Sequence, residues 1–246
     1  MRIALQPSYV LHSRPYRDSS MLLEVFTAEQ GRISLVARGA RRKSRGGSSG
    51  ALLQPFTPLL LSFSGRTDLK NLNATESAGQ PLWLKGERLF SGLYLNELLV
   101  RLLHRHDPHP QLFAKYSGTL QELAGSDEMD ASLRRFEFFL LSELGYGFSL
   151  ALDGDSGEAV QAQCWYNYHP DWGLVARGAT ADPAQPAFAG ADLLVMADGD
   201  FGGMARATAK RLLRLVLATH LGDMPLRSRD LFRAHVASRQ APAVQE

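Results

Sequence analysis

The residues whose chemistry stands out first are basic side chains gathered in one short segment, residues 38–50: Arg38, Arg41, Arg42, Lys43 and Arg45. The segment contains no acidic residue, and most of its other positions are Gly or Ser, so it is poor material for a core. Lys and Arg displace condensed counterions when they lie on a phosphate backbone. The segment therefore predicts a flexible loop that binds a polyanion, first of all a nucleic acid.

A second group is the run from His104 to His109, which holds three histidines and Asp107. These residue types bind metal ions, and a metal-dependent enzyme built on them is one hypothesis for the chain. Arg105 and the prolines at positions 108 and 110 disturb the geometry. We favour the alternative of a solvated helix end, where the negative pole of the helix dipole stabilises a histidine.

The remaining candidates for catalysis or metal binding are weaker. Segments 153–157 and 198–202 begin like calcium-binding loops, but Cys164 and Ala209 stand where such loops need an acidic residue. No Ser-His-Asp arrangement, Gly-rich nucleotide loop or His-Glu-x-x-His motif stands out. Because Cys164 is the single cysteine, an internal disulfide and a Cys-rich zinc site are excluded. We expect a protein that is not an enzyme and has no cofactor.

Charge is segregated along the chain, although the net charge is only +2. Residues 1–80 carry a net charge of +6, residues 81–200 carry −9, and residues 201–246 carry +5. This pattern favours one or two polyanion-binding surfaces and an acidic middle that avoids the ligand. The alternative is that the asymmetry only aids solubility.

The second basic region contains a stripe formed by Arg206, Lys210 and Arg214, which follow one another at the spacing of one helix face. Leu213 and Leu217 lie beside it in the sequence. Positive charge next to exposed apolar carbon would suit DNA, or an acidic peptide with a hydrophobic end. A solvated helix face with both leucines turned inward fits equally well.

Apolar runs in this sequence are all shorter than the roughly 18 residues needed to span a bilayer. The first seven residues lack the sustained apolar core of a signal peptide and end at Pro7. We therefore expect a cytoplasmic protein without a membrane partner.

The basic loop must be positioned by β-structure, because residues 1–80 show short apolar runs separated by turn residues. The expected strands are 9–12, 20–27, 32–38, 52–63 and 69–75. Segment 32–38 alternates strictly, as a half-buried strand does, and two prolines place part of 52–63 at an edge or bulge. Five short strands with one long loop predict an OB-like barrel, although an SH3-like barrel fits nearly as well.

Residues 81–240 change to a helical period, which predicts an α+β protein with a helical C-terminal domain. The expected helices end near His104, Gly125 and Leu144, span 203–221, and cover 229–236 with Ser228 as N-cap. Residues of about 153–200 are rich in Gly, Asp and Pro, and predict a small irregular β or loop insert. Residues 241–246 are expected to be a disordered tail.

Taken together, several segments resemble the RecO family of bacterial recombination mediators. They are 10–16, 35–41, 53–59, 93–99, 133–137, 144–147 and 225–232. The match runs along nearly the whole chain in the same order. The resemblance implies an N-terminal OB fold, a helical C-terminal domain and association with the nucleoid. Many members carry a four-cysteine zinc module near the insert, and since this chain keeps only Cys164, we expect no zinc and a remodelled insert.

The resemblance also implies activities and partners. It implies binding of single- and double-stranded DNA, annealing of complementary strands, and help in loading RecA onto DNA coated by single-strand-binding protein (SSB). RecR and the acidic C-terminal tail of SSB are the implied partners. An RNA-binding OB module remains the alternative from a different class.

Two sets of site residues follow from the resemblance. The DNA-binding set is Arg14, Arg38, Arg41, Arg42, Lys43 and Arg45, on the barrel. The set for the SSB tail or a second basic surface is Arg134, Arg135, Arg206, Lys210, Arg214, Arg227 and Arg229. Within the second set we expect Arg134 and Arg135 at the surface, beside a buried Phe136.

Overall fold

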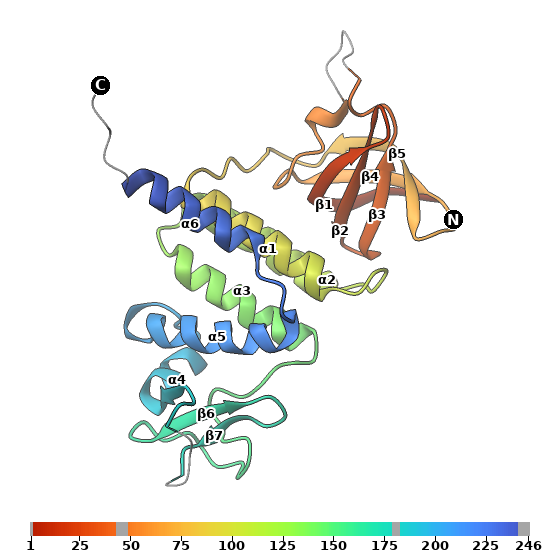
Figure 1. Cartoon of the computed structure of the whole chain (residues 1–246). Helices are drawn as coiled ribbons and strands as arrows, with labels where there is room; N and C mark the ends of the chain where they lie inside the picture. Colours follow the sequence, from red (N-terminus) through yellow and green to blue (C-terminus); the bar gives the residue numbers. More distant parts are fainter. Residues whose placement is uncertain (1, 43–48, 179–182, 241–246) are drawn as a thin grey trace, which may run out of the picture. The chain divides into compact units, whose positions relative to one another are not determined.

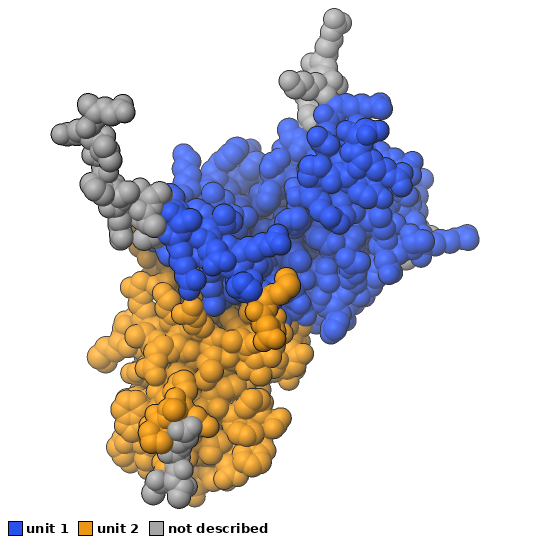
Figure 2. Space-filling model, viewed as in Figure 1, with its two compact units in different colours: residues 1–125, 225–246 blue, residues 126–224 orange. Residues whose placement is uncertain are grey.

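A computed structural model of the chain describes residues 2–42, 49–178 and 183–240. These residues form two compact units (Figure 2), the first made of residues 1–125 and 225–246 and the second of residues 126–224. The first unit holds the barrel and three helices. The second unit holds three further helices and a small sheet (Figure 1).

The N-terminal strands close into a five-stranded barrel. They are β1 (Arg2–Tyr16), β2 (Ser20–Thr27), β3 (Gly31–Ala37), β4 (Leu59–Ser64) and β5 (Leu69–Ser77). The order around the barrel is β1-β2-β3-β5-β4, with β3 and β5 parallel and all other pairs antiparallel. A closed five-stranded barrel of this order fits the OB fold, and the predicted α+β class is confirmed.

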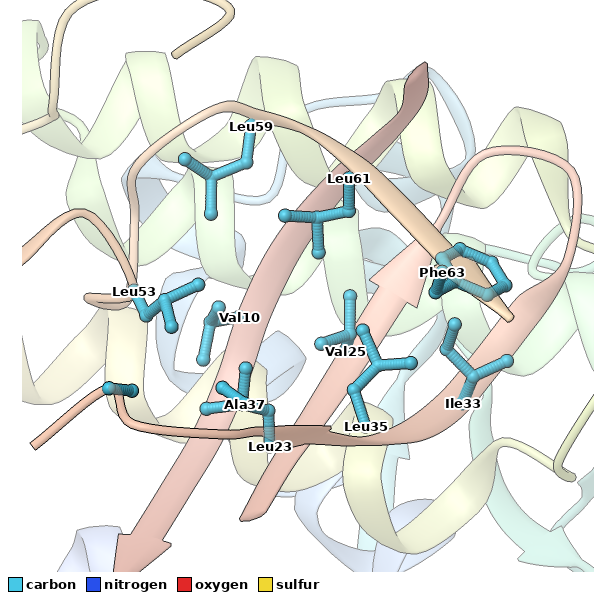
Figure 3. Close-up of a cluster of buried hydrophobic side chains, with 11 residues drawn as sticks. Val10, Leu23, Val25, Ile33, Leu35, Ala37, Leu53, Leu59, Leu61 and Phe63 are labelled. Carbon is cyan, nitrogen blue, oxygen red and sulfur yellow. The ribbon is translucent and has the colours of Figure 1, made fainter. Parts of the chain in front are cut away.

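Alternate residues of these strands fill the barrel (Figure 3). Leu23 and Val25 of β2 face Ile33 and Leu35 of β3, and all four are fully buried. Each such side chain contributes about 1.5–3 kcal/mol of stability relative to leaving it exposed. The alternation at 32–38 places Ile33 and Leu35 in the barrel core, but Ser34 and Val36 on the other face are also buried, so β3 is more buried than the expected half-buried strand.

Two strands differ from the sequence expectation. β1 is much longer than the expected residues 9–12. Its register shifts near Ile3 and again near Val10, and because these shifts break the period-two pattern, the full strand could not be recognised in the sequence. Segment 52–58 is not a strand, so β4 begins only at Leu59. Phe56 has a positive φ of 64° between Pro55 and Pro58, a backbone conformation that ends extended structure.

The first unit continues with α1 (Glu87–Leu102), α2 (Pro110–Gly125) and α6 (Arg227–Gln240). Helix α6 packs on α1, and its N-terminus is held by the Glu97 carboxylate. That carboxylate accepts hydrogen bonds from the Arg227 and Ser228 N–H groups and from the Ser228 hydroxyl. The expectation that Ser228 caps the helix is therefore wrong: Ser228 lies in the first turn, and α1 supplies the cap.

An aromatic cluster joins the barrel to α2. Tyr9 and Phe26 on the outside of the barrel contact Phe113 and Tyr116, with ring centroids 5.3–6.2 Å apart. The Tyr116 hydroxyl donates to Asn96 at 2.6 Å. Burial raises the pKa of Tyr116 well above its usual value, with a smaller contribution from Tyr9. Tyr116 therefore acts as a neutral packing and donor group.

The second unit contains α3 (Met129–Glu143), α4 (Gly190–Ala197) and α5 (Arg206–Leu221), with a sheet of order β7-β6-β8. The strands are β6 (Trp165–His169), β7 (Gly173–Ala176) and β8 (Ala187–Ala189). The predicted insert is thus a small ordered sheet followed by a helix. Helix α4 was not expected from the sequence, because a helix of eight residues leaves little periodic pattern.

Candidate nucleic-acid interface

The strand register defines rows of side chains on the outer face of the barrel. Arg14 of β1 pairs with Leu22 of β2, Leu22 pairs with Val36 of β3, and Val36 pairs with Asn71 of β5. Residues directly opposite one another project to the same face of a sheet. These four side chains therefore form one row across four strands.

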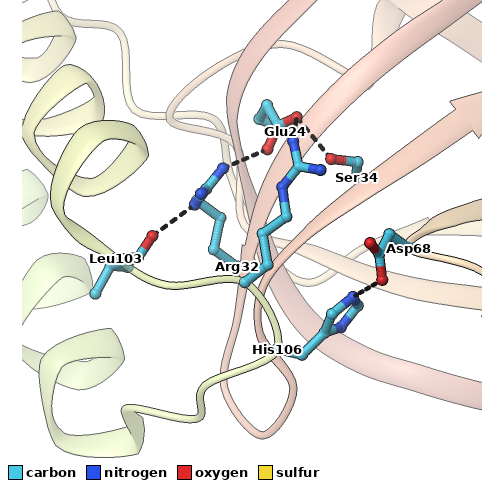
Figure 4. Close-up of polar contacts among 7 residues, drawn as sticks. Glu24, Arg32, Ser34, Asp68, Leu103 and His106 are labelled. Carbon is cyan, nitrogen blue, oxygen red and sulfur yellow. Dashed lines mark hydrogen bonds and ion pairs between the residues drawn. The ribbon is translucent and has the colours of Figure 1, made fainter.

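The neighbouring row on this face is occupied by a polar network (Figure 4). The Glu24 carboxylate accepts hydrogen bonds from Arg32 at 2.9 Å, Ser34 at 2.6 Å and Arg105 at 3.2 Å. Arg32 also donates to the carbonyl of Leu103 at 3.1 Å. Because two cations neutralise Glu24, the carboxylate is poorly placed to repel a phosphate backbone lying on the adjacent row.

The Val36–Asn71 end of this row opens into a cleft of about 660 Å³. It is bounded by the β1–β2 turn, the end of β3 and the start of β5; the residues that matter below are Tyr16, Arg17, Val36, Arg38, Arg42 and Asn71. The neighbourhood of strands 2–3 and the adjoining loops is the surface through which OB folds bind oligonucleotides. The cleft thus lies where an OB fold is suited to hold a strand.

The base of the cationic loop is fixed to the barrel. Ala40 is buried in the barrel core, and the Arg41 N–H donates to the Ser19 carbonyl at 3.1 Å. The Arg42 N–H donates to the carbonyl of Gly39, whose φ of 68° is the left-handed conformation that this turn requires. The backbone is pinned here while the side chains of Arg38, Arg41 and Arg42 stay exposed.

The β1–β2 turn adds two side chains that the sequence analysis did not assign to the site. The guanidinium of Arg17 lies 5.2 Å from the centroid of the Tyr16 ring, and both residues line the cleft. An aromatic ring offers a surface on which a base can stack, and the cation adds to the attraction for phosphate. In the sequence, a Tyr-Arg pair next to a Ser-rich turn could have indicated these site residues. Only the fold shows that they line the same cleft as Arg38 and Arg42.

The predicted DNA-binding residues fall into three groups. Arg38 and Arg42 line the cleft, and Arg14 lies in the row beside it. Arg41 is exposed on the same loop, and its guanidinium contacts the Asp18 carbonyl at 3.5 Å. Lys43 and Arg45 lie outside the described residues.

The histidine run has a structural role in the first unit. The His106 N–H donates to the Arg32 carbonyl at 3.0 Å, and its ring lies 3.6 Å from Asp68. The Nε2 atom of His109 lies 3.4 Å from a carboxylate oxygen of Asp107. Within the described ranges, no group of three or more His, Cys, Asp or Glu side chains is gathered in a way that could hold a metal ion. The run docks a loop onto the barrel.

Comparison with known proteins covers almost the entire chain. The family model described as recombination protein O, N terminal, matches residues 1–80, and the model described as recombination protein O, C terminal, matches residues 84–230. The chain belongs to the RecO family. Over 93–95% of its length it is 47% identical to the DNA repair protein RecO of Methylococcus capsulatus and 49% identical to that of Pseudomonas paraeruginosa, and it covers 94% of each.

Within this RecO-family chain, the second predicted set of basic residues is not uniform. Arg134 is buried, with 7% of its surface exposed, and its guanidinium lies 2.7 Å from the fully buried carboxylate of Glu137. The expectation of a surface position for Arg134 is therefore wrong. Arg135 is half-buried, lies 3.9 Å from Glu128 and donates to Ser132.

The stripe on α5 is exposed, but it is less charged than it looks in the sequence. Arg206 pairs with Asp130, whereas Lys210 and Arg214 are exposed positive charges one turn apart. Leu213 and Leu217 are fully buried, so they face inward and offer no apolar contact to a ligand. The structure therefore agrees with the alternative of a solvated helix face with both leucines turned inward.

The last two predicted residues belong to α6, in the first unit. Arg227 is exposed, and its N–H donates to Glu97. The guanidinium of Arg229 lies 5.6 Å from the ring centroid of Tyr94. Arg229 thus helps to hold α6 on α1. Among the described residues, no helix is both long and apolar enough to span a bilayer.

Proposed function

We propose that this chain binds DNA through the barrel cleft and acts in recombinational repair. The observation that carries the proposal is the open cleft on an OB barrel, where Arg17, Arg38 and Arg42 meet beside Tyr16. Family membership supports the same role, since the relatives are named as DNA repair proteins. The cations hold the backbone of a strand, while the ring offers a sequence-tolerant stacking surface.

Annealing of complementary strands fits these contacts. An annealing protein must hold a strand without reading its base edges, so that the edges stay available for pairing. Contacts to phosphate position a strand and carry no sequence information, which is what the task requires. We propose that the protein binds single- and double-stranded DNA in this way, assists loading of RecA onto SSB-coated DNA, and works with RecR.

The acidic tail of SSB is the proposed ligand of α5. Lys210 and Arg214 are exposed on one helix face and can pair with carboxylates. Arg134 is left out of this proposal because it is buried against Glu137. Replacing Lys210 and Arg214 with Ala should lower affinity for an SSB-tail peptide while leaving affinity for naked single-stranded DNA unchanged. Unchanged peptide affinity would reject the assignment.

The function is tested by strand annealing of complementary oligonucleotides, naked and coated with SSB. The protein should accelerate annealing in both cases, and SSB lacking its acidic tail should abolish the acceleration on coated strands only. A protein that accelerates neither reaction contradicts the proposal. Competition between single-stranded DNA and RNA of the same length separates the proposal from the RNA-binding alternative, which predicts a preference for RNA.

A further inference from the structure

The small sheet of the second unit carries an aromatic outer face that its own packing does not use. Along β6, Trp165 and His169 are two alternations apart and project to the same side. Trp165 is 54% exposed. Trp172, which is 56% exposed, stacks on the His169 ring with centroids 4.9 Å apart. Two large aromatic side chains are thus left in solvent on one small surface.

The two aromatic groups lie at opposite ends of β6. His169 lies four steps along the extended strand from Trp165, which places the two groups about 13 Å apart. Asn167 and its register partner Val175 lie between them. Beside Trp165 there is a cleft of about 470 Å³, lined in part by Ala176 and Arg177. The face therefore offers two aromatic platforms, a floor of Asn167 and Val175 between them, and a recess at one end.

The turn at residues 153–157 is tied by hydrogen bonds to the strand β7 that borders this face. Asp153, which is buried, accepts hydrogen bonds from the N–H groups of Asp155, Ser156 and Ala176, tying the turn at 153–157 to the end of β7. A Cβ on Gly154 would lie 1.6 Å from the carbonyl oxygen of Trp172, so this turn packs directly on the backbone that presents the tryptophan. A preorganised aromatic surface loses little conformational entropy when it binds a ligand.

The charge around the face restricts its ligand. Residues 145–200 as a whole contain eight acidic residues and one basic residue, Arg177, which lines the recess beside Trp165. Asp155, Glu158 and Asp171 are exposed on the turns that adjoin β7. Such a surface repels nucleic acid, and it equally repels a second copy of itself. Exposed tryptophans bordered by carboxylates suit a ligand that carries cations and apolar rings.

We propose that the outer face of β6 and β7 is a docking surface for a basic, proline-containing, extended segment of a partner protein. An extended segment rises about 3.3 Å per residue and presents alternate side chains on one face, so side chains four positions apart span about 13 Å and reach both aromatic platforms. Its prolines stack on the indole rings, and its cations pair with the surrounding carboxylates. This surface is separate from the proposed DNA cleft, and failure of one proposal leaves the other standing.

The test uses the full chain labelled with 5-fluorotryptophan and observed by ¹⁹F NMR. The chain has three tryptophans, so Trp83 serves as an internal reference for Trp165 and Trp172. The probe is a synthetic twelve-residue Arg-Pro repeat, and a Glu-Pro repeat of equal length is the control. The Arg-Pro peptide should shift the signals of Trp165 and Trp172 but not that of Trp83. The Glu-Pro peptide should shift none.

Two sets of variants locate the binding. Trp165→Ala with Trp172→Ala removes both reporters, so its binding is measured by fluorescence anisotropy of a labelled Arg-Pro peptide, and it should be at least about tenfold weaker. Asp155→Asn with Glu158→Gln, at two exposed positions, should also weaken binding of this peptide. The proposal is overturned if millimolar Arg-Pro peptide shifts neither tryptophan, or if the Glu-Pro peptide binds as well. It is likewise overturned if a dT12 oligonucleotide, or raised protein concentration alone, shifts the same two signals.

Discussion

At the residue scale, the cations of the cleft are exposed side chains that take no part in the barrel core. Arg38 and Arg42 are exposed, whereas Arg32, on the same strand region, is committed to Glu24 and Leu103. The same residue type thus has two roles, set by whether a carboxylate on a neighbouring strand lies within reach of the guanidinium. The position of a cation on the barrel decides whether it can serve a ligand.

Tyr16 provides a test at this scale. Replacing Tyr16 with Ala should weaken binding of single-stranded DNA by about 1–3 kcal/mol, the usual cost of losing one base–aromatic stack. Tyr16→Phe keeps the ring and should bind like the unmodified protein. Fluorescence anisotropy with a labelled oligonucleotide measures both variants. Equal affinity for the Ala and Phe variants, both unchanged, would show that no base stacks on this ring.

At the element scale, the loop that carries the histidines is held against the β2–β3 turn. A Cβ on Gly31 would lie 2.0 Å from the carbonyl oxygen of Asp107, and Gly31 has a φ of 63°. Glycine is needed at this position because the backbone is left-handed and because two segments of the chain approach each other closely. The histidine run, which looked like a metal site in the sequence, is explained by this docking.

Gly31→Ala should accordingly destabilise the first unit by about 1–3 kcal/mol or more, because it adds strain and pushes the loop off the barrel. Gly118→Ala is the matched control, since a Cβ at that helical position meets no atom within 4 Å. The control should be neutral or stabilising by up to about 1 kcal/mol. Urea denaturation of both variants decides the matter, and equal midpoints would contradict the docking role.

In the second unit, the turn at Asp153 should make stability sensitive to acid. Burial acts to raise the pKa of Asp153, but hydrogen bonds from Ser156, Ala176 and Asp155 outweigh it and lower the pKa below its usual value. The folded form therefore favours the ionised carboxyl, and its stabilisation is present at neutral pH and is lost as the pH falls through the lowered pKa. Asp153→Asn should destabilise the unit at pH 7 and reduce the further loss on acidification.

Thermal unfolding at several pH values measures this effect. Asp155→Asn, an exposed neighbour in the same turn, is the control and should keep the pH dependence of the unmodified protein. If Asp153→Asn and Asp155→Asn lose stability with acid to the same extent, the three hydrogen bonds do not contribute the expected linkage.

Elements with a clear period could be predicted from the sequence. The bounds expected for β2, residues 20–27, agree with the structure, because Leu23 and Val25 alternate into the core. The pattern failed where the chain bends: two register shifts hide β1, and α4 is too short to show a helical period. It also failed for Arg134, since a buried ion pair leaves no mark in a single sequence.

At the scale of the whole molecule, charge and chemistry divide between the two units. The first unit, residues 1–125 and 225–246, contains 20 basic and 11 acidic residues, and the second contains 7 and 14. The cationic loop pointed to polyanion binding from its composition alone. Its meeting with Tyr16, Arg17 and Asn71 could not be predicted, because strands distant in the sequence form that cleft. The first unit is therefore the proposed DNA-binding part.

The most direct test compares the two basic surfaces through the salt dependence of binding to single-stranded DNA. One variant replaces Arg17, Arg38 and Arg42 with Ala, and the other replaces Arg206, Lys210 and Arg214, so each loses three positive charges. Each lost phosphate contact reduces the slope of log K against log salt by about 0.7. The cleft variant should lose about 2 in slope while the α5 variant keeps its slope. An unchanged slope in the cleft variant, or a loss confined to the α5 variant, would contradict the account.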